Sequence, residues 1–111
     1  MEKQNRYNGF TNYETWAVSL WMSNDRAAFD YFRTLAFVTL STEKSRSTKE
    51  SAPEDSIRSL ANTLRQEFEE RSPVREHATV YADLMNAALS EVDWYELADN
   101  LLSDLTEDEE G

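Results

Sequence analysis

The chain contains no cysteine and, among its 111 residues, only two glycines and two prolines. The lack of cysteine excludes disulfide bonds, thiolate nucleophiles and cysteine-type zinc sites together. So few glycines and prolines leave few turn residues, which argues against β-hairpins and favours long helices. Two glycines are also too few for the glycine-rich loops that hold nucleotide phosphates.

Long apolar runs are absent as well. No stretch approaches the roughly 18–20 residues that a membrane span needs, and residues 1–10 lack the apolar core of a signal peptide. We therefore expect a cytoplasmic protein that does not bind a membrane. Hydrophobic residues make up 40% of the chain, which at this length is enough for one buried core.

Bases are missing from the last third of the chain. All eleven lysines and arginines lie at or before Arg75, together with eleven acids, so residues 1–75 carry no net charge. Residues 76–111 hold the other eleven acids and hence the whole net charge of −11. Such a segment repels nucleic acid and membrane phosphate and attracts basic surfaces or cations.

Apolar residues recur at helical spacing in five segments. The pattern predicts an all-α, compact bundle of four to five helices, in a single domain over residues 1–105. The mixed-charge segment 41–52 is expected to be an exposed loop, and residues 106–111 a frayed acidic tail. The predicted helices lie near residues 11–24, 25–40, 53–72, 73–90 and 93–105.

Capping residues mark the start of two of these helices. Thr11 and Glu14 have the spacing of a capping box, in which a hydroxyl and a carboxylate satisfy the free amides of the first turn. Asp93 and Glu96 repeat this spacing before the last helix. We therefore predict helix caps at Thr11, Glu14 and Asp93.

The apolar stripes of these helices define a predicted core. On the fourth helix the stripe includes the only histidine, His77, which we interpret as a core or boundary residue. No nucleophile or set of metal ligands stands at a suitable spacing from it, so we expect no enzyme, no cofactor and no metal site. The residues expected to fill the core are Tyr13, Trp16, Leu20, Trp21, Phe32, Leu35, Leu60, Leu64, Leu84, Trp94, Leu97 and Leu101.

Two sequence blocks carry a resemblance to a known family. The segment 7–21, YNGFTNYETWAVSLW, is followed by Ser23-Asn24-Asp25, and Val92–Ala98, VDWYELA, forms a second block. They resemble a family of small, acidic, uncharacterised proteins of phages, plasmids and prokaryotic genomes with an N-terminal TNYETW motif. The resemblance implies a mobile-element context, hence the host cytoplasm, and supplies no activity. The residues of the two blocks are compatible with two roles, either in stabilising the fold or in contacting a partner.

The acidic third suggests the first functional hypothesis, nucleic-acid mimicry. The protein would bind a basic, nucleic-acid-binding surface of a host protein, as an inhibitor of the anti-restriction or anti-CRISPR type. Duplex DNA carries one charge per about 1.7 Å, whereas the last two helices place one acid per ~5–8 Å. Neither helix alone matches a duplex, whereas two adjacent helices plus the tail, or a symmetric dimer, would come closer. The predicted acidic face consists of Glu76, Asp83, Glu91, Glu96, Asp99, Asp104, Glu107 and Asp108.

The alternative is a small helical adaptor or regulator that binds a partner, or a second copy, through an apolar patch. A third interpretation is that the acids only keep the surface solvated, but a solvated surface normally mixes both signs. Direct nucleic-acid binding is not expected because the bases are scattered among acids. The apolar residues that support the adaptor hypothesis are Val18, Met22, Phe29, Phe37 and Val38.

Overall fold

The computed structural model describes residues 6–46, 53–73 and 78–110, with side chains described over 6–42, 54–73 and 78–105. The all-α prediction is confirmed, and no helix in these parts of the chain is long and apolar enough to cross a membrane. The described helices are α1 (Tyr13–Asn24), α2 (Arg26–Arg46), α3 (Pro53–Arg71), α4 (Val80–Ser90) and α5 (Trp94–Glu110).

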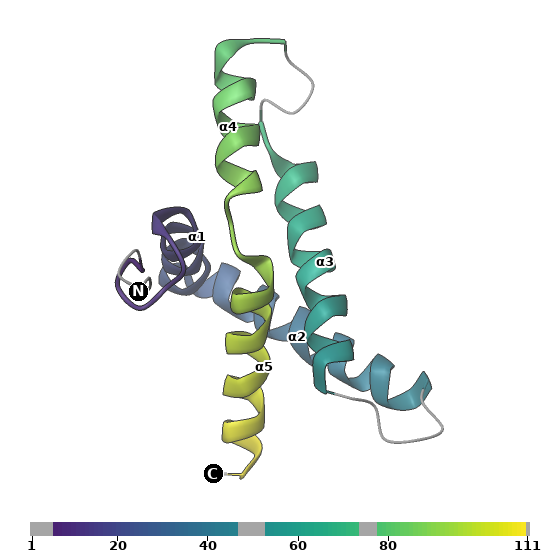
Figure 1. Ribbon diagram of the computed structural model, residues 1–111. Coiled ribbons are helices and arrows are strands. Elements are labelled where there is room, and N and C mark those ends of the chain that lie inside the picture. Colours follow the sequence, from purple (N-terminus) through teal and green to yellow (C-terminus); the bar gives the residue numbers. More distant parts are fainter. Residues whose placement is uncertain (1–5, 47–52, 74–77, 111) are drawn as a thin grey trace.

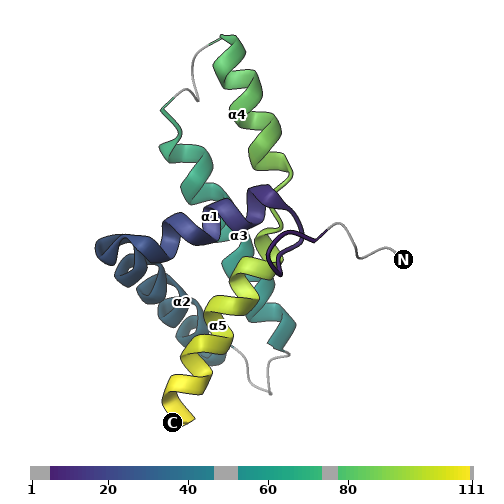
Figure 2. The same ribbon diagram turned by 90° about the vertical axis from the view of Figure 1, so that its left-hand side faces the viewer.

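Helices α2, α3 and α5 surround the core. In Figure 1, α3 runs antiparallel beside α5, and α2 crosses behind both. Helix α1 packs on α2 and lies in front of α3 in Figure 2. Helix α4 rises away from α1, α2 and α5 in both views, and no described residue of α4 belongs to the core cluster.

Aromatic rings join the three core helices. Phe32 of α2 stacks on Phe68 of α3, with ring centroids 5.6 Å apart, and Phe68 meets Trp94 of α5 at 5.5 Å. Leu60 and Leu64, one turn apart on α3, are fully buried in the same cluster. Burying a side chain of this size contributes about 1.5–3 kcal/mol, so this cluster holds α2, α3 and α5 together.

The predicted core is correct for these three helices, where one side of each helix is distinctly apolar. The residues concerned are the buried Phe32, Leu60, Leu64 and Leu97 and the partly buried Leu35, Trp94 and Leu101.

The predicted core face of α1 is wrong. Tyr13, Leu20 and Trp21 are 54%, 37% and 72% exposed, while Thr15 and Met22 are buried. At about 100° per residue the two sets lie on opposite sides of the helix. Helix α1 is apolar on both sides, so its hydrophobic period does not select the buried one.

A tight turn precedes α1 and covers Trp16. Asn8 and Gly9 both have positive φ, 47° and 89°, as in a type I′ turn. Tyr7 and Phe10 exchange two backbone hydrogen bonds across it. The turn brings the Tyr7 ring to 5.1 Å from that of Trp16. Trp16 is therefore half-buried under the chain's lead-in and not in the central core.

The buried face of α4 is also opposite to the prediction. Tyr81 and Leu84 are 70% and 63% exposed, whereas Ala82 is buried. Met85 and Leu89, one and two turns after Ala82, are partly buried on the same side. Helix α4 has apolar residues on most of its circumference, so again the period alone could not choose the inner face.

Helix α4 starts later than predicted. It begins at Val80 instead of near residue 73, with Thr79 as its N-cap, whose hydroxyl accepts a hydrogen bond from the Ala82 amide at 3.2 Å. A threonine at this position satisfies a free amide of the first turn. Glu76 and His77 lie outside the described residues, so their predicted roles stay predictions.

Two other helices are longer than predicted. Helix α2 runs to Arg46 instead of ending near Leu40, because residues 41–46 contain no glycine or proline to stop it. Helix α5 runs to Glu110, so the expected frayed tail is helical over residues 106–110. The rest of the predicted loop after α2 lies outside the described residues.

Candidate functional site

The two family-like sequence blocks meet in space. The start of α1 lies beside the linker between α4 and α5 (Figure 2). There Asn12 Nδ2 donates to the Glu91 carbonyl oxygen at 2.6 Å, and the Thr11 hydroxyl donates to Asp93 Oδ2 at 2.8 Å. The Asp93 amide donates to Thr15 Oγ1 at 2.8 Å. We call these five residues the interlock, because they fasten both ends of the chain to each other.

The cap of α1 is Asn12, and the predicted Thr11–Glu14 capping box is wrong. Asn12 Oδ1 accepts from the Thr15 amide at 2.9 Å and from the Thr15 hydroxyl at 2.6 Å. The Thr11 hydroxyl is instead bonded to Asp93. Thr15 is completely buried, and its hydroxyl is satisfied as both donor and acceptor, so its burial leaves no polar atom unpaired.

The cap of α5 is Asp93, as predicted. Asp93 Oδ1 accepts from the Glu96 amide at 3.0 Å. Glu96 does not complete a capping box, because its carboxylate accepts from the Thr11 amide at 2.9 Å and pairs with Arg6 Nη2 at 2.8 Å. The Glu96 side chain is only 18% exposed. Its predicted place on an outward acidic face is therefore wrong, since it holds the N-terminal segment.

Four other predicted acids face solvent. Asp83 on α4, Glu91 at the end of α4, and Asp99 and Asp104 on α5 are all exposed. None of them forms an ion pair with a described residue. Helix α5 continues the course of α4 in Figure 1, so these carboxylates follow one run of chain about 30 Å long.

Acids become denser toward the end of α5. Glu107 and Asp108 belong to this helix, although the placement of their side chains lies outside the described residues. Six acids occupy residues 99–110. At ~1.5 Å per residue the average over this stretch is one acid per ~3 Å of helix axis, similar to the spacing of about 3.4 Å between phosphates along one DNA strand, and four of the six acids are the consecutive residues 107–110. The structure thus makes this end the densest acidic part of the site.

These acids have the wrong charge for the end of a helix. The C-terminal end carries a partial negative charge and is stabilised by cations, yet the last turn of α5 contains no base. Like charges four residues apart, such as Asp104 and Asp108, cost a helix about 0.2–0.5 kcal/mol per pair. The acids therefore reduce the stability of α5, a conflict that is expected at functional sites.

Helices α2 and α3 differ from α5 in mixing both signs of charge. Their ion pairs join residues three or four positions apart on the same helix, where they neutralise each other locally. The pairs are Arg26–Asp30, Arg58–Asp55, Arg65–Glu69 and Arg71–Glu67, with nitrogen–oxygen distances of 3.7, 3.5, 3.7 and 3.1 Å.

An apolar groove, absent from the sequence-based predictions, opens between α4 and the body of the protein. Its volume is about 580 Å³, within the ~300–1,000 Å³ range of ligand pockets. Four helices contribute to it, and most of its residues lie off the predicted stripes, which explains why the sequence did not reveal it. Apolar side chains that line it are Trp21, Met22, Phe32, Phe68, Met85 and Leu89.

A polar contact borders this groove. Arg71, which lines the groove, lies 5.0 Å from the ring centre of Tyr31 and donates to its hydroxyl at 3.3 Å. The hydrogen bond between Glu67 and the Tyr31 hydroxyl raises the pKa of Tyr31 above its usual 10.0. Glu67 also pairs with Arg71 at 3.1 Å, so the guanidinium is held at the groove edge.

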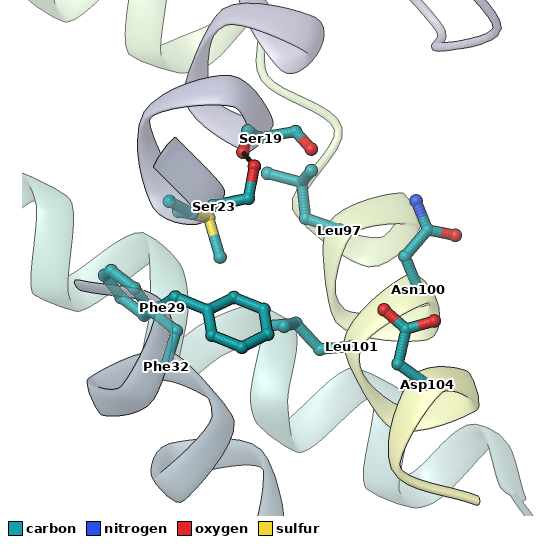
Figure 3. Close-up of a pocket in the computed structure, with 9 residues that line it drawn as sticks. Ser19, Ser23, Phe29, Phe32, Leu97, Asn100, Leu101 and Asp104 are labelled. Atoms are coloured by element: carbon teal, nitrogen blue, oxygen red, sulfur yellow. Dashed lines mark hydrogen bonds between the residues drawn. The ribbon is translucent and has the colours of Figure 1, made fainter. Parts of the chain in front are cut away.

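A smaller pocket lies between α1, α2 and α5 (Figure 3). Ser19 and Ser23 border it from α1, and Asn100 and Asp104 from α5. Its volume of about 90 Å³ is too small for an organic ligand. The described residues contain no group of three His, Cys, Asp or Glu side chains that could hold a metal ion. We therefore assign no ligand to this pocket.

Comparison with known proteins gives one match. A family model matches residues 3–108, and it describes a family of unknown function, DUF7249. No curated protein and no solved structure matches the chain. The matched range includes the interlock, the groove and most of the acidic run.

Proposed function

We propose that the chain, which belongs to the DUF7249 family, binds a basic, nucleic-acid-binding surface of another protein through the acids of α5. The observation that carries this proposal is the run of six acids over residues 99–110 without a single base. The mobile-element context implied by the family resemblance makes a host defence nuclease complex the expected target. The protein then acts as an inhibitor of the anti-restriction or anti-CRISPR type.

The proposed contact uses the end of α5 as a stand-in for one nucleic-acid strand. Basic grooves bind nucleic acid largely through its phosphates, and carboxylates at a similar spacing can pair with the same lysines and arginines. A basic partner also relieves the repulsion among these acids and their conflict with the helix dipole. Binding and helix stability are therefore linked, and the partner stabilises α5.

The acids nearer to α4 have a different part in this proposal. Asp83 and Glu91 lie ~12 Å apart along the chain, and Glu91 lies another ~12 Å before Asp99. Asp83 and Glu91 are therefore too far apart to imitate neighbouring phosphates. Unopposed charges at such distances mainly speed association with a basic surface. Glu96 takes no part, because its carboxylate is already paired with Arg6.

Two charge-matched variants test the proposal. Each replaces three acids by amides and so raises the net charge from −11 to −8. The α5 variant carries Asp99→Asn, Asp104→Asn and Asp108→Asn. The control variant carries Asp30→Asn, Asp55→Asn and Glu69→Gln, which lie in locally neutralised ion pairs of α2 and α3.

The wild type and both variants are immobilised and exposed to a prokaryotic lysate, and retained proteins are eluted with duplex DNA. We expect wild type and control to retain nucleic-acid-binding proteins that DNA displaces, and the α5 variant to lose them. Retention that resists DNA, or that is equal for the α5 variant, contradicts the proposal. Failure of the wild type to retain any nucleic-acid-binding protein contradicts it as well.

The adaptor hypothesis is the second candidate, and the exposed Trp21 supports it. Trp21 is 72% exposed at an apolar groove of about 580 Å³, and exposed aromatics beside apolar pockets are typical of interaction sites. Binding through this groove should be insensitive to salt and to the α5 variant. Binding through the groove should be lost in Trp21→Ala, whereas binding through the acids of α5 should be unchanged in that variant. The two hypotheses therefore predict opposite results.

A further inference from the structure

Helix α4 is strongly apolar but poorly covered. Between Val80 and Ser90 its only charged residue is Asp83, in a chain with 30% charged residues. No described residue of α4 belongs to the core cluster, and both views show the helix rising away from α1, α2 and α5 (Figures 1 and 2). A helix of this length is marginally stable in water on its own, so α4 depends on packing against other surfaces.

The uncovered side of α4 is a continuous apolar surface. Val80, Tyr81 and Leu84 are 60%, 70% and 63% exposed. Ala87 and Ala88 continue the same surface by one turn, and at about 100° per residue the five residues span ~120° of the helix. We call them the α4 ridge. A helix that is apolar on its inner side and along such a ridge is typically buried on both sides.

We propose that the α4 ridge is a homodimer interface, in which α4 of one copy packs against α4 of a second copy about a two-fold axis. Such an axis presents the same patch from both copies, so an apolar ridge on one copy meets an apolar ridge on the other. Ala87 and Ala88 allow the two helices to approach closely near the larger Tyr81 and Leu84. The helical period of the sequence predicts burial of Leu84, and a second copy would bury it together with Tyr81 and Ala88.

The distribution of charge favours a second copy over a basic partner as the occupant. Two chains of net charge −11 repel each other, most strongly where the acids of α5 are dense. They can associate most easily through a surface with little charge, and α4 carries only Asp83 among its 11 residues. A basic partner protein, by contrast, is attracted to α5 and gains nothing from this neutral ridge.

The exposed area of the α4 ridge is consistent with a reversible dimer. The five residues of the ridge offer roughly 500 Å² per copy, most of it from Val80, Tyr81 and Leu84, which are 60%, 70% and 63% exposed. A dimer would then bury at most about 1,000 Å² in total, in the range of weak, transient interfaces. We therefore expect a dimer that dissociates on dilution. This inference does not depend on the proposed function, because it concerns α4 and not the acids.

Sedimentation equilibrium over a range of concentrations tests the proposal. The wild type should approach twice the 12.9 kDa mass of one chain at high concentration, and Tyr81→Glu/Leu84→Glu should remain monomeric. The matched control Phe37→Glu/Val38→Glu, at α2 residues that are 54% and 52% exposed, should dimerise like the wild type. A wild type that is monomeric throughout overturns the proposal, as does a dimer lost only in the control.

A cross-linking experiment covers the case in which glutamates on α4 unfold that helix. The chain has no cysteine, so a single one reports on one position. Ala87→Cys on the ridge should give a covalent dimer with a short bis-maleimide, and dilution should abolish it. Asn62→Cys, on the exposed side of α3, should stay monomeric. Equal cross-linking of both variants, or none for Ala87→Cys, contradicts an interface at α4.

Discussion

The buried Thr15 hydroxyl accepts a hydrogen bond from the backbone amide of Asp93 at 2.8 Å, across 78 residues of chain. Asp93 caps α5, and Asn12, which caps α1, accepts a hydrogen bond from the Thr15 hydroxyl through its Oδ1. The starts of the first and last helices are thus bonded through one threonine. The polar residues of both family-like blocks contribute to the fold, while the exposed acids of α5 take no part in these contacts.

Replacing Thr15 should destabilise the protein strongly. Thr15→Val keeps the shape of the side chain but leaves the partly buried Asp93 amide without an acceptor, at a cost of about 1–3 kcal/mol. For a domain of this size each kcal/mol lowers Tm by ~4–8 °C, which thermal unfolding will show. The control is Thr63→Val, since the Thr63 hydroxyl bonds only within its own helix. Equal Tm losses in both variants contradict the interlock.

Asn12 and Thr15 should act as one unit. Asn12→Ala removes the cap of α1, worth about 0.5–2 kcal/mol, and also the 2.6 Å bond to the Glu91 carbonyl. Because Asn12 and Thr15 share hydrogen bonds, the double variant should lose less stability than the sum of the single variants, with a coupling of ~0.5–3 kcal/mol. Chemical unfolding of the four proteins measures this coupling, and strict additivity would show that the interlock is not cooperative.

Glu96 and Asp99, three residues apart, should have separable roles. Glu96→Gln weakens an ion pair of 2.8 Å with Arg6 on a mostly buried carboxylate, so it should reduce the free energy of unfolding by about 1–2 kcal/mol. Asp99→Asn changes an exposed residue and should stay within ~0.5 kcal/mol of the wild type. Unfolding curves and retention of basic proteins, measured on the same samples, should therefore rank the variants in opposite order.

Neutralising acids at the end of α5 should stabilise the protein while it weakens binding. Asp104→Asn/Asp108→Asn removes a like-charge pair at the negative end of the helix, for a gain of a few tenths of a kcal/mol. The gain should shrink as salt screens the wild-type repulsion. Thermal unfolding at low and high salt measures this effect. A loss of stability would mean that these carboxylates stabilise the fold, which contradicts the account that they destabilise α5 in the absence of a partner.

The fold was predictable from sequence where helices have a single apolar side. For α3 the period selects Leu60 and Leu64 correctly, and both are buried. In α1 and α4 apolar residues lie on several sides, so the predicted cores at Trp21 and Leu84 are exposed. The buried side of α1 is marked by Thr15, which forms a hydrogen bond to a residue far along the chain. Sequence patterns alone would place a threonine within a helix on the surface.

The distribution of acids was predictable from sequence, but their individual contacts were not. The absence of bases after Arg75 predicts unopposed acids over α4 and α5, and Asp83, Asp99 and Asp104 are exposed there. Sequence spacing could not show that Glu96 pairs with Arg6, because that pair joins residues 90 positions apart. Nor could it show that α5 continues to Glu110, since repeated acids at the end of a helix disfavour such an extension.

The measurement that tests the central claim most directly is the salt dependence of affinity for a retained nucleic-acid-binding protein. It is made with the wild type, the α5 variant and the charge-matched control. Contacts between carboxylates and a basic groove predict that affinity falls steeply with salt for wild type and control, and that the α5 variant binds weakly with a shallow dependence. Equal affinities and slopes for the two variants would contradict a specific role for the acids of α5.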